Sequence, residues 1–413
     1  MAFFSATVDT LLRNDLEHAY EDMAWGGQYA ALIGLMQKED FTGDAKKVPL
    51  KTDLGGGMSA DAPTAYANAT LAGRQAFVVT PFTTTGFSII PLNQAAFTSG
   101  NDNSVVDLLL DESKTAMDSC KMQFDQALAL DGSGTVATIV SHSGGGPYTL
   151  TLKTQTQCNR LTVNATYASK ATAFAGSLDT GTFTITNIAT QSKQITVTAN
   201  GGWTPTDTHV FGLAGTVLAS TGLATWPGIP GWIPPAANRP VASTAFFSVD
   251  RSVNEQKLAG LYLDATSPAL GTLEAINQLA FNIANVPGSM PDLVVMSFIR
   301  LGAVVAQLQT QRRYVENSVQ GPGINVFYKS CTIVGPKGDM DIVASSNWSE
   351  DLVAVLTKST WVIASPGNKP FVPATANGNP IVEVFNDDKA VAKYRAQAIV
   401  YCTAPGHNGM ASF

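Results

Sequence analysis

The feature that most constrains the fold is a long helical segment, residues 101–131, that contains no glycine or proline. Residues 101–104 (NDNS) offer capping side chains at its start, and residues 131–134 (DGSG) form a stop signal. A helix of this length extends roughly 40 Å, so we predict a structural spine. Its apolar side chains recur at the spacing of an amphipathic helix, at Val106, Leu109, Leu110, Met117, Cys120, Phe124, Ala127 and Leu128.

A block of short predicted strands follows the spine directly. Runs rich in Val, Ile and Thr alternate there with Gly, Asn and Ser turns, which is typical of a small antiparallel barrel or sandwich. Because the block begins at the stop signal of the spine, we interpret it as a domain inserted into another fold. The proline-rich residues 226–235 (WPGIPGWIPP) are predicted to form a stiff linker back. The predicted strands are residues 135–141, 148–153, 160–166, 182–188, 194–200 and 209–213.

The chain before the spine divides into two parts. Residues 1–37 are predicted to be helix interrupted by Gly26 and Gly27, with one apolar face that docks on the chain's own core or on a neighbouring subunit. Residues 38–73 are polar and carry three successive glycines at 55–57, so a long regular element is excluded. Two strand-like runs, 75–80 and 86–90, predict a hairpin. Together these residues indicate a long extended excursion.

The chain from about residue 246 onward mixes helices and strands, which predicts an α+β region. An amphipathic helix is expected around Leu273 to Ile283, a buried strand at Leu293 to Met296, and a second helix capped by Ser297. Further strands are predicted at residues 324–334, 340–345, 352–363, 380–385 and 391–402.

Composition narrows the function classes. Charged residues make up 14% of the chain, against about 25% in typical soluble proteins. Extensive subunit contacts would explain this scarcity, and so would a large β domain rich in Thr and Ser. The net charge of −7 and the lack of a basic block argue against tight nucleic acid binding as the main task, although a container that encloses DNA is compatible with them. No signal peptide or membrane span is predicted.

Residues with catalytic or metal-binding potential do not form a recognisable motif. The four cysteines, Cys120, Cys158, Cys331 and Cys402, are far apart and form no CxxC pair, which argues against a zinc site or a disulfide framework. The glycines of residues 141–146 (SHSGGG) are better explained by a turn between strands than by a catalytic serine or a phosphate loop. Asp339, Asp341, Asp387 and Asp388 are interpreted as exposed turn acids. The histidines, none in an HxxxH or HExxH pattern, are His18, His142, His209 and His407.

We therefore predict no catalytic, cofactor-binding or metal-binding residue, no cofactor, and no enzymatic activity. The order of the predicted parts is more informative than any motif: an amphipathic arm, an extended excursion, a spine ending in Asp-Gly-Ser-Gly and a mixed body. This order resembles the major capsid protein fold of tailed bacteriophages, the Hong Kong 97-like fold, which encapsulins share. The resemblance covers nearly the whole chain, and its local matches are residues 102–134, 292–308, 323–345 and 391–402.

The resemblance implies an α+β capsid fold that carries an inserted small all-β domain, which the minimal fold lacks. Its parts would be an N-terminal arm (1–37), an extended E-loop (38–98), the spine helix of the peripheral domain (99–134), the β insert with its proline-rich linker (135–245), the axial domain with part of the peripheral domain (246–375), and C-terminal strands of the peripheral domain (376–413).

The implied function is a shell subunit that self-assembles into pentamers and hexamers around phage double-stranded DNA. The implied partners are other copies of the chain, scaffolding and portal proteins, and a cement or decoration protein; DNA would be enclosed without sequence-specific binding, and no membrane is involved. The location would be the virion capsid, assembled in the bacterial host cytoplasm. The alternatives are an encapsulin-like nanocompartment shell and a β-rich adhesin or carbohydrate-binding protein. Lys46, Lys47 and Lys51 lie where some relatives crosslink, but no partner asparagine is indicated and no crosslink is predicted. We also expect no cleaved scaffold domain, or a separate scaffolding protein.

Overall fold

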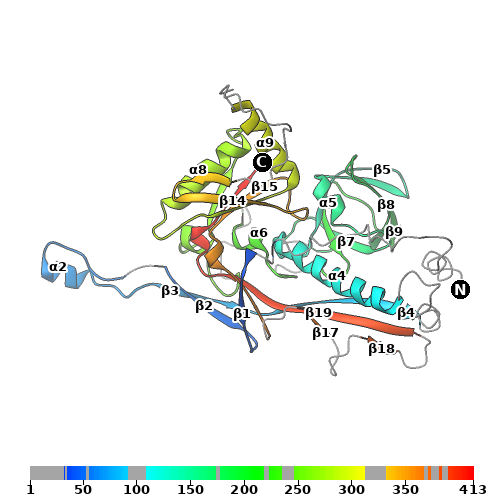
Figure 1. Ribbon diagram of the computed structural model, residues 1–413, viewed down its shortest axis with the longest axis horizontal. Helices are drawn as coiled ribbons and strands as arrows, with labels where there is room; N and C mark the ends of the chain where they lie inside the picture. Colours follow the sequence, from blue (N-terminus) through cyan, green and yellow to red (C-terminus); the bar gives the residue numbers. More distant parts are fainter. Residues whose placement is uncertain are drawn as a thin grey trace, which may run out of the picture.

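The computed structural model describes residue 32 and residues 35–52, 55–91, 108–173, 177–217, 223–234, 246–311, 332–366, 371–373, 381–383 and 389–413. Over these residues the chain is α+β, as predicted, and comprises two mixed sheets, a closed barrel and a two-stranded ribbon (Figure 1). The helix predicted within residues 1–37 lies almost entirely outside the described residues, and its last residue, Gln37, begins a strand.

The first sheet is organised by its longest strand, and we call it the β19 sheet. β19 pairs antiparallel with β4 through ten residue pairs, and with β16 through its last four residues. The β strand predicted at 391–402 is thus confirmed. The members are β1 (Gln37–Asp40), β4 (Phe82–Pro91), β16 (Trp361–Ser365), β17 (Phe371–Pro373), β18 (Ile381–Glu383) and β19 (Lys389–Cys402).

The predicted spine is helix α4 (Leu108–Leu128), which lies along β4 and β19 (Figure 1). Cys120, Phe124 and Leu128 are buried there, four residues apart in each case, as the 3.6-residue rhythm requires. The helix ends just before the predicted stop signal, where Gly132 and Gly134 adopt positive φ angles of 87° and 79°.

The second sheet, which we call the β12 sheet, is covered by α8 (Thr272–Ala284) through the apolar face predicted from the sequence, Ile276, Leu279 and Ile283 included. Helix α9 (Phe298–Gln311) packs beside α8, and Ser297 caps it by accepting a hydrogen bond from the Arg300 amide. The strands, in sheet order, are β11 (Leu261–Asp264), β20 (Gly409–Ser412), β15 (Leu352–Leu356), β12 (Leu293–Met296), β14 (Gly338–Ala344) and β13 (Thr332–Gly335).

One strand predicted over residues 352–363 is in fact two strands in different sheets. A 3₁₀ turn, η3 (Lys358–Thr360), separates β15 from β16. A second short turn, η5 (Pro405–His407), separates β19 from β20. Hydrophobic patterning could not find these breaks, because the residues on both sides of η3 are equally buried.

The inserted block is a closed six-stranded barrel, which decides between the barrel and sandwich predictions. Its interior holds Tyr167, Phe183, Trp203 and Phe211. The strands, in barrel order, are β10 (Val210–Leu213), β5 (Ala137–Ser143), β6 (Tyr148–Leu152), β9 (Gln194–Asn200), β8 (Thr182–Ala189) and β7 (Thr166–Lys170).

The strand predicted at residues 160–166 was wrong. Helix α5 (Gln155–Asn159) occupies the preceding residues, and β7 begins only at Thr166. Asn164 has a φ angle of 66°, a left-handed conformation that interrupts an extended strand.

The hairpin predicted between residues 75–80 and 86–90 was also wrong. β3 (Arg74–Val79) pairs antiparallel with β2 (Lys46–Lys51), whereas β4 pairs with β19. The physical reason is the length of β19, which offers β4 a ladder of ten pairs that a short hairpin with β3 cannot match.

The predicted proline-rich linker is instead part of the main hydrophobic core. Trp226 and Trp232 are 1% and 0% exposed, and Ile229 begins a short buried helix, α6 (Ile229–Trp232). The Trp226 indole nitrogen donates to the Ala398 carbonyl of β19 at 2.9 Å. Burying two indole rings gains more free energy than leaving them in a solvated linker, so the segment folds onto the end of α4.

Candidate assembly surface

The two-stranded ribbon of β2 and β3 is fastened to the body at its base. Phe77 is fully buried and meets the Trp232 ring edge-on, with ring centroids 5.1 Å apart. The Val78 amide donates to the Phe247 carbonyl at 3.1 Å, and the Lys257 ammonium donates to the Thr52 carbonyl. The base of the ribbon is therefore held by packing and by hydrogen bonds.

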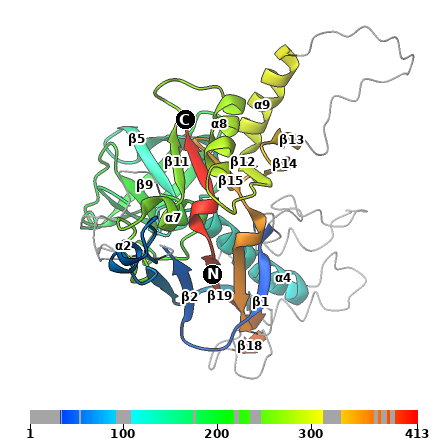
Figure 2. The same ribbon diagram turned by 90° about the vertical axis from the view of Figure 1, so that its left-hand side faces the viewer.

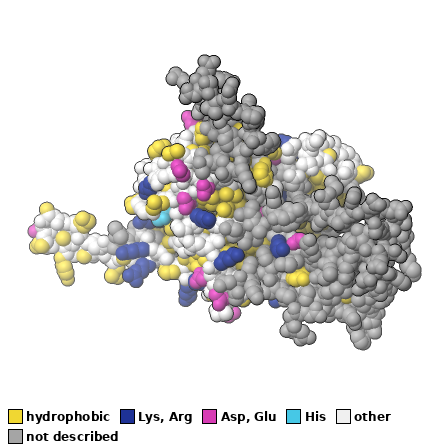
Figure 3. Space-filling view, in the orientation of Figure 1, with side chains coloured by type: hydrophobic (Ala, Val, Ile, Leu, Met, Phe, Trp, Pro, Cys, Tyr) yellow, Lys and Arg dark blue, Asp and Glu magenta, His cyan; other side chains and the backbone are white. Residues whose placement is uncertain are grey.

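The tip of the ribbon, residues 55–73, extends away from the body at the left of Figure 1. It carries the short helix α2 (Ala62–Ala67), which Asp61 caps by accepting from the Thr64 amide and which has no buried residue. Met58, Tyr66 and Leu71 are 94%, 86% and 97% exposed. Figure 3 shows apolar side chains on the protruding tip. Exposed large apolar side chains on an extended element indicate a surface completed by another molecule.

The ribbon base carries the lysines considered for crosslinking. Lys46 is half-buried and pairs with Glu39 at 2.6 Å, and the Tyr401 hydroxyl donates to the same carboxylate. The hydrogen bond from Lys46 lowers the pKa of Glu39, whereas burial raises the pKa of Tyr401. Lys47 and Lys51 are exposed. Figure 3 shows the cations gathered where the ribbon leaves the body.

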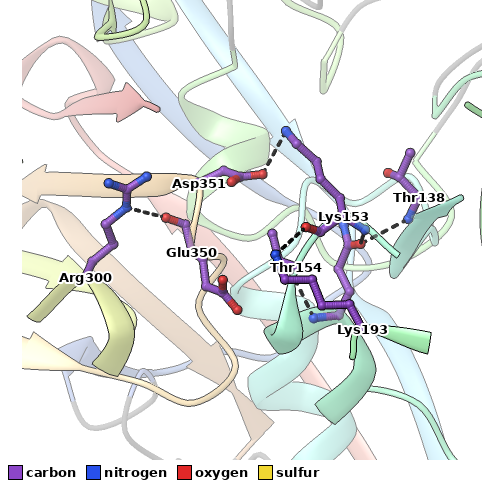
Figure 4. A network of polar contacts seen from close by, with 8 residues as sticks. Thr138, Lys153, Thr154, Lys193, Arg300, Glu350 and Asp351 are labelled. Carbon is purple, nitrogen blue, oxygen red and sulfur yellow. Dashed lines mark hydrogen bonds and ion pairs between the residues drawn. The ribbon is translucent and has the colours of Figure 1, made fainter. Parts of the chain in front are cut away.

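The barrel is joined to the body by polar contacts with the loop that precedes β15 (Figure 4). Glu350 accepts hydrogen bonds from the amide and the hydroxyl of Thr156, at 2.9 and 3.1 Å. Its neighbour Asp351 pairs with Lys153 at 2.7 Å. On the other side, the Arg300 guanidinium donates to the Glu350 carbonyl at 2.6 Å, so the same loop connects the barrel to helix α9.

A second, buried connection joins the barrel to the spine. Arg160 is only 6% exposed, and its guanidinium donates to the Asn347 backbone carbonyl at 3.1 Å. The Asn347 amide donates to Asp125 of α4 at 2.9 Å, and the Leu32 backbone amide donates to the other Asp125 oxygen at 3.1 Å. Burial raises the pKa of Asp125 to about 6 and lowers the pKa of Arg160 to about 10. Both groups are costly to bury, which makes this junction sensitive to the loss of any partner.

Sequence reasoning did not single out Asp125, Asn347 or Glu350. The sequence carries a weak indication that Asp125 is buried, because it lies between Phe124 and Ala127 on the apolar face of the spine. Nothing in the composition of residues 345–351 distinguishes them from an ordinary surface loop.

The fold is similar to that of solved capsid structures. The chain matches the cyanophage A-1(L) capsid asymmetric unit with a TM-score of 0.57 and 9% sequence identity, over 98% of this chain and 97% of that chain. It matches the capsid of a native GTA particle with a TM-score of 0.51 and 8% identity, over 98% and 96%. The chain has the capsid-protein fold of tailed phages. No protein-family model matches the sequence, and no curated protein is similar to it by sequence.

The three histidines that the structure describes are not gathered into one site. His142 and His209, both in the barrel region, pair separately with Asp207 at 2.7 Å and with Asp179 at 2.8 Å. His407 lies in η5, where burial lowers its pKa. His18 lies outside the described residues, as do Asp387 and Asp388.

The other residues with chemical potential are also dispersed. Asp339 and Asp341 are exposed, as predicted, but they lie on strand β14 and not in a turn. The glycines of residues 144–146 lie in the turn between the paired strands β5 and β6, as predicted. Over the part of the chain that the structure describes, no group of three or more His, Cys, Asp or Glu residues is placed to hold a metal ion. A depression of about 250 Å³ beside β16 and β19 is lined by Phe41, Pro81, Ile399 and uncharged neighbours. In the described ranges, no helix is both long and apolar enough to cross a membrane.

Proposed function

We propose that this chain is the major capsid protein of a tailed bacteriophage, which self-assembles into pentamers and hexamers that form an icosahedral shell around double-stranded DNA. The observation that carries the proposal is a capsid fold over nearly the full chain, with a ribbon whose tip leaves large apolar side chains exposed. A single copy leaves Met58 and Leu71 in water, and a second copy that covers them would stabilise the ribbon by mass action.

The predicted division of the chain is carried into this proposal. Residues 1–37 are the N-terminal arm, 38–98 the E-loop that lies over an adjacent copy, and 99–134 the spine. Residues 246–375 supply the axial domain and part of the peripheral domain, and residues 376–413 supply the C-terminal strands. The ribbon of β2 and β3 supports the E-loop assignment, with the modification that β1 and β4, at its two ends, belong to the β19 sheet. The insert, 135–245, is supported by the closed barrel, although its last part packs in the body core.

The shell subunit has no enzymatic role, assembles in the bacterial host cytoplasm and resides in the virion capsid. Its partners are copies of itself, with scaffolding and portal proteins and a cement or decoration protein. DNA is enclosed without sequence-specific contacts, in keeping with the net charge of −7.

The test is electron microscopy and sedimentation of the purified chain, expressed alone and together with a scaffolding protein from the same source. Closed shells, or rings of five and six subunits, support the proposal. A monomer or small oligomer under both conditions contradicts it and favours the adhesin alternative. Shells that hold a protein cargo instead of DNA when isolated from their natural source favour the encapsulin-like alternative.

A variant designed on the ribbon makes this test specific. Replacing Met58, Tyr66 and Leu71 together with serine removes the exposed apolar side chains from the tip. The matched control replaces Val140 and Val163, which are 49% and 43% exposed on the barrel, with serine. We expect the ribbon variant to lose shells while the barrel variant keeps them.

A further inference from the structure

The chain passes twice between the two sheets of the body, each time through a short 3₁₀ turn. We call the region of these two turns, η3 and η5, the joint. β15 of the β12 sheet leads through η3 into β16 of the β19 sheet. β19 leads back through η5 into β20 of the β12 sheet. β15 pairs with β20 on one side of the breaks, where Val355 faces Gly409, and β16 pairs with β19 on the other side, where Trp361 faces Cys402. In Figure 2 the C-terminal end of the chain lies above β19, on the far side of this joint.

A single side chain bridges both breaks. Asn408 is fully buried and directly follows η5. Its side-chain oxygen accepts hydrogen bonds from the Thr357 amide at 2.9 Å and from the Trp361 indole nitrogen at 3.0 Å, on the two sides of η3. Its side-chain nitrogen donates to the Ala404 carbonyl at 2.9 Å and to the Thr360 hydroxyl at 3.0 Å. Asn408 therefore connects the segment before η5 with both ends of η3.

The orientation of this amide follows from its partners. The Thr357 amide and the Trp361 indole can only donate, and the Ala404 carbonyl can only accept. The oxygen and the nitrogen of Asn408 must therefore point as they do. No other side chain of this size offers both an acceptor for two N–H groups and two donors, because aspartate lacks the donors and alanine lacks both.

The side-chain hydrogen bonds of Asn408 are sensitive to the angle between the two sheets, because they are directional and buried. A rotation of one sheet against the other would lengthen bonds on one side of the joint, and each buried donor left without a partner would be costly. Two further hydrogen bonds connect the residues around η3 with those around η5. The Thr357 hydroxyl donates to the His407 carbonyl at 2.9 Å, and the Thr403 amide donates to the Thr360 carbonyl at 2.8 Å.

We propose that Asn408 is the positioning residue that fixes the angle between the β12 sheet and the β19 sheet, and thereby the curvature at which copies of the chain meet. The second clause rests on the proposed function of the chain as a shell subunit. The first clause concerns the single chain and holds whether or not shells form.

The test measures the distance between spin labels placed on the two sheets of the unassembled chain. The labels are attached to Val334→Cys on β13 and Ile89→Cys on β4, which are 81% and 51% exposed, in a Cys331→Ser background. The variants are Asn408→Asp, which removes the two donors, and Thr360→Val, which removes the hydroxyl that Asn408 binds. The matched control is Ile276→Val, a buried change in α8 at a residue that makes none of the hydrogen bonds of Asn408.

We expect the distance distribution of both joint variants to be about twofold broader or more than that of the parent, with the control unchanged. Equal widths in parent, joint variants and control would overturn the proposal. If Asn408→Asp does not fold, Trp361→Phe, which removes one donor only, takes its place in the same comparison.

Shells formed by the same variants test the second clause. We expect the joint variants to form shells of several diameters where the parent forms one. Shells of one unchanged diameter, together with a broadened label distance, would overturn the link to curvature alone. A parent chain that forms no shells at all would count against the proposed function, and the label distances would still decide the role of Asn408.

Discussion

The barrel and the ribbon both extend from the same body, yet only the barrel is complete within the chain. The barrel closes its strands on one another and fills its interior with aromatic rings, among them Phe183 and Trp203 with centroids 4.3 Å apart. The ribbon has two strands, and Met58 and Leu71 near its tip are more than nine-tenths exposed. A two-stranded hairpin alone is marginally stable in water. The difference teaches that one excursion is stabilised by its own core and the other requires a neighbour.

The largest expected effect is in the barrel interior. Phe183→Ala should lower the free energy of unfolding of the barrel by about 3–5 kcal/mol, because it leaves a cavity beside Trp203 and Phe211. Denaturant unfolding followed by tryptophan fluorescence measures the loss. Phe183→Leu is the control and should cost less, since it keeps most of the apolar volume. A loss below about 1 kcal/mol for the alanine variant would show that the barrel is not held by this core.

The next effect concerns pH and the buried junction between the spine and the barrel. Burial raises the pKa of Asp125 from 3.8 to about 6, so the folded chain binds this proton more tightly than the unfolded chain. Stability from this group is greatest below pH 3.8 and falls as the pH rises to about 6, by at most about 3 kcal/mol. Unfolding measured from pH 4 to 7 should show this slope in the parent and lose it in Asp125→Asn. An identical slope in the two proteins would contradict the assignment.

A smaller effect separates two adjacent acids in the loop that holds the barrel. Glu350→Ala leaves the amide and hydroxyl of the buried Thr156 without an acceptor and should cost about 1–2 kcal/mol. Asp351→Ala removes a pair with the largely exposed Lys153 and should cost about 0.5 kcal/mol or less. Thermal unfolding of both variants ranks them, and the reverse order would contradict this account of the junction.

The smallest effect on folding is expected at the ribbon tip. Leu71→Ala should change the free energy of unfolding of the unassembled chain by no more than about 0.5 kcal/mol, because the side chain is 97% exposed. The same substitution should reduce the yield of shells, which sedimentation measures. A large loss of stability in the unassembled chain would mean that the tip is already packed within one copy and would break the contrast with the barrel.

Local patterns predicted the spine, helix α8 and five of the six barrel strands, because each of these elements repeats its apolar residues at the period of its own geometry. The partner of β4 could not be predicted in this way, since β19 lies about three hundred residues further along the chain and strand pairing depends on register rather than on period. Trp226 and Trp232 were assigned to a linker because the prolines and glycines around them are typical of a linker segment. Asn408 and Glu350 gave no signal, because a buried polar residue is distinguished only by the partners that the fold brings to it.

The most direct test of the central claim is amide hydrogen exchange of one sample in two states, the unassembled chain and the assembled shell. We predict that residues 55–73 of the ribbon exchange rapidly in the unassembled chain and become protected in the shell. The barrel strands β8 and β9 should be protected to the same degree in both states and serve as the internal reference. Ribbon amides that exchange equally fast in the shell, or that are already protected in the unassembled chain, would contradict the claim that a neighbouring copy completes the ribbon.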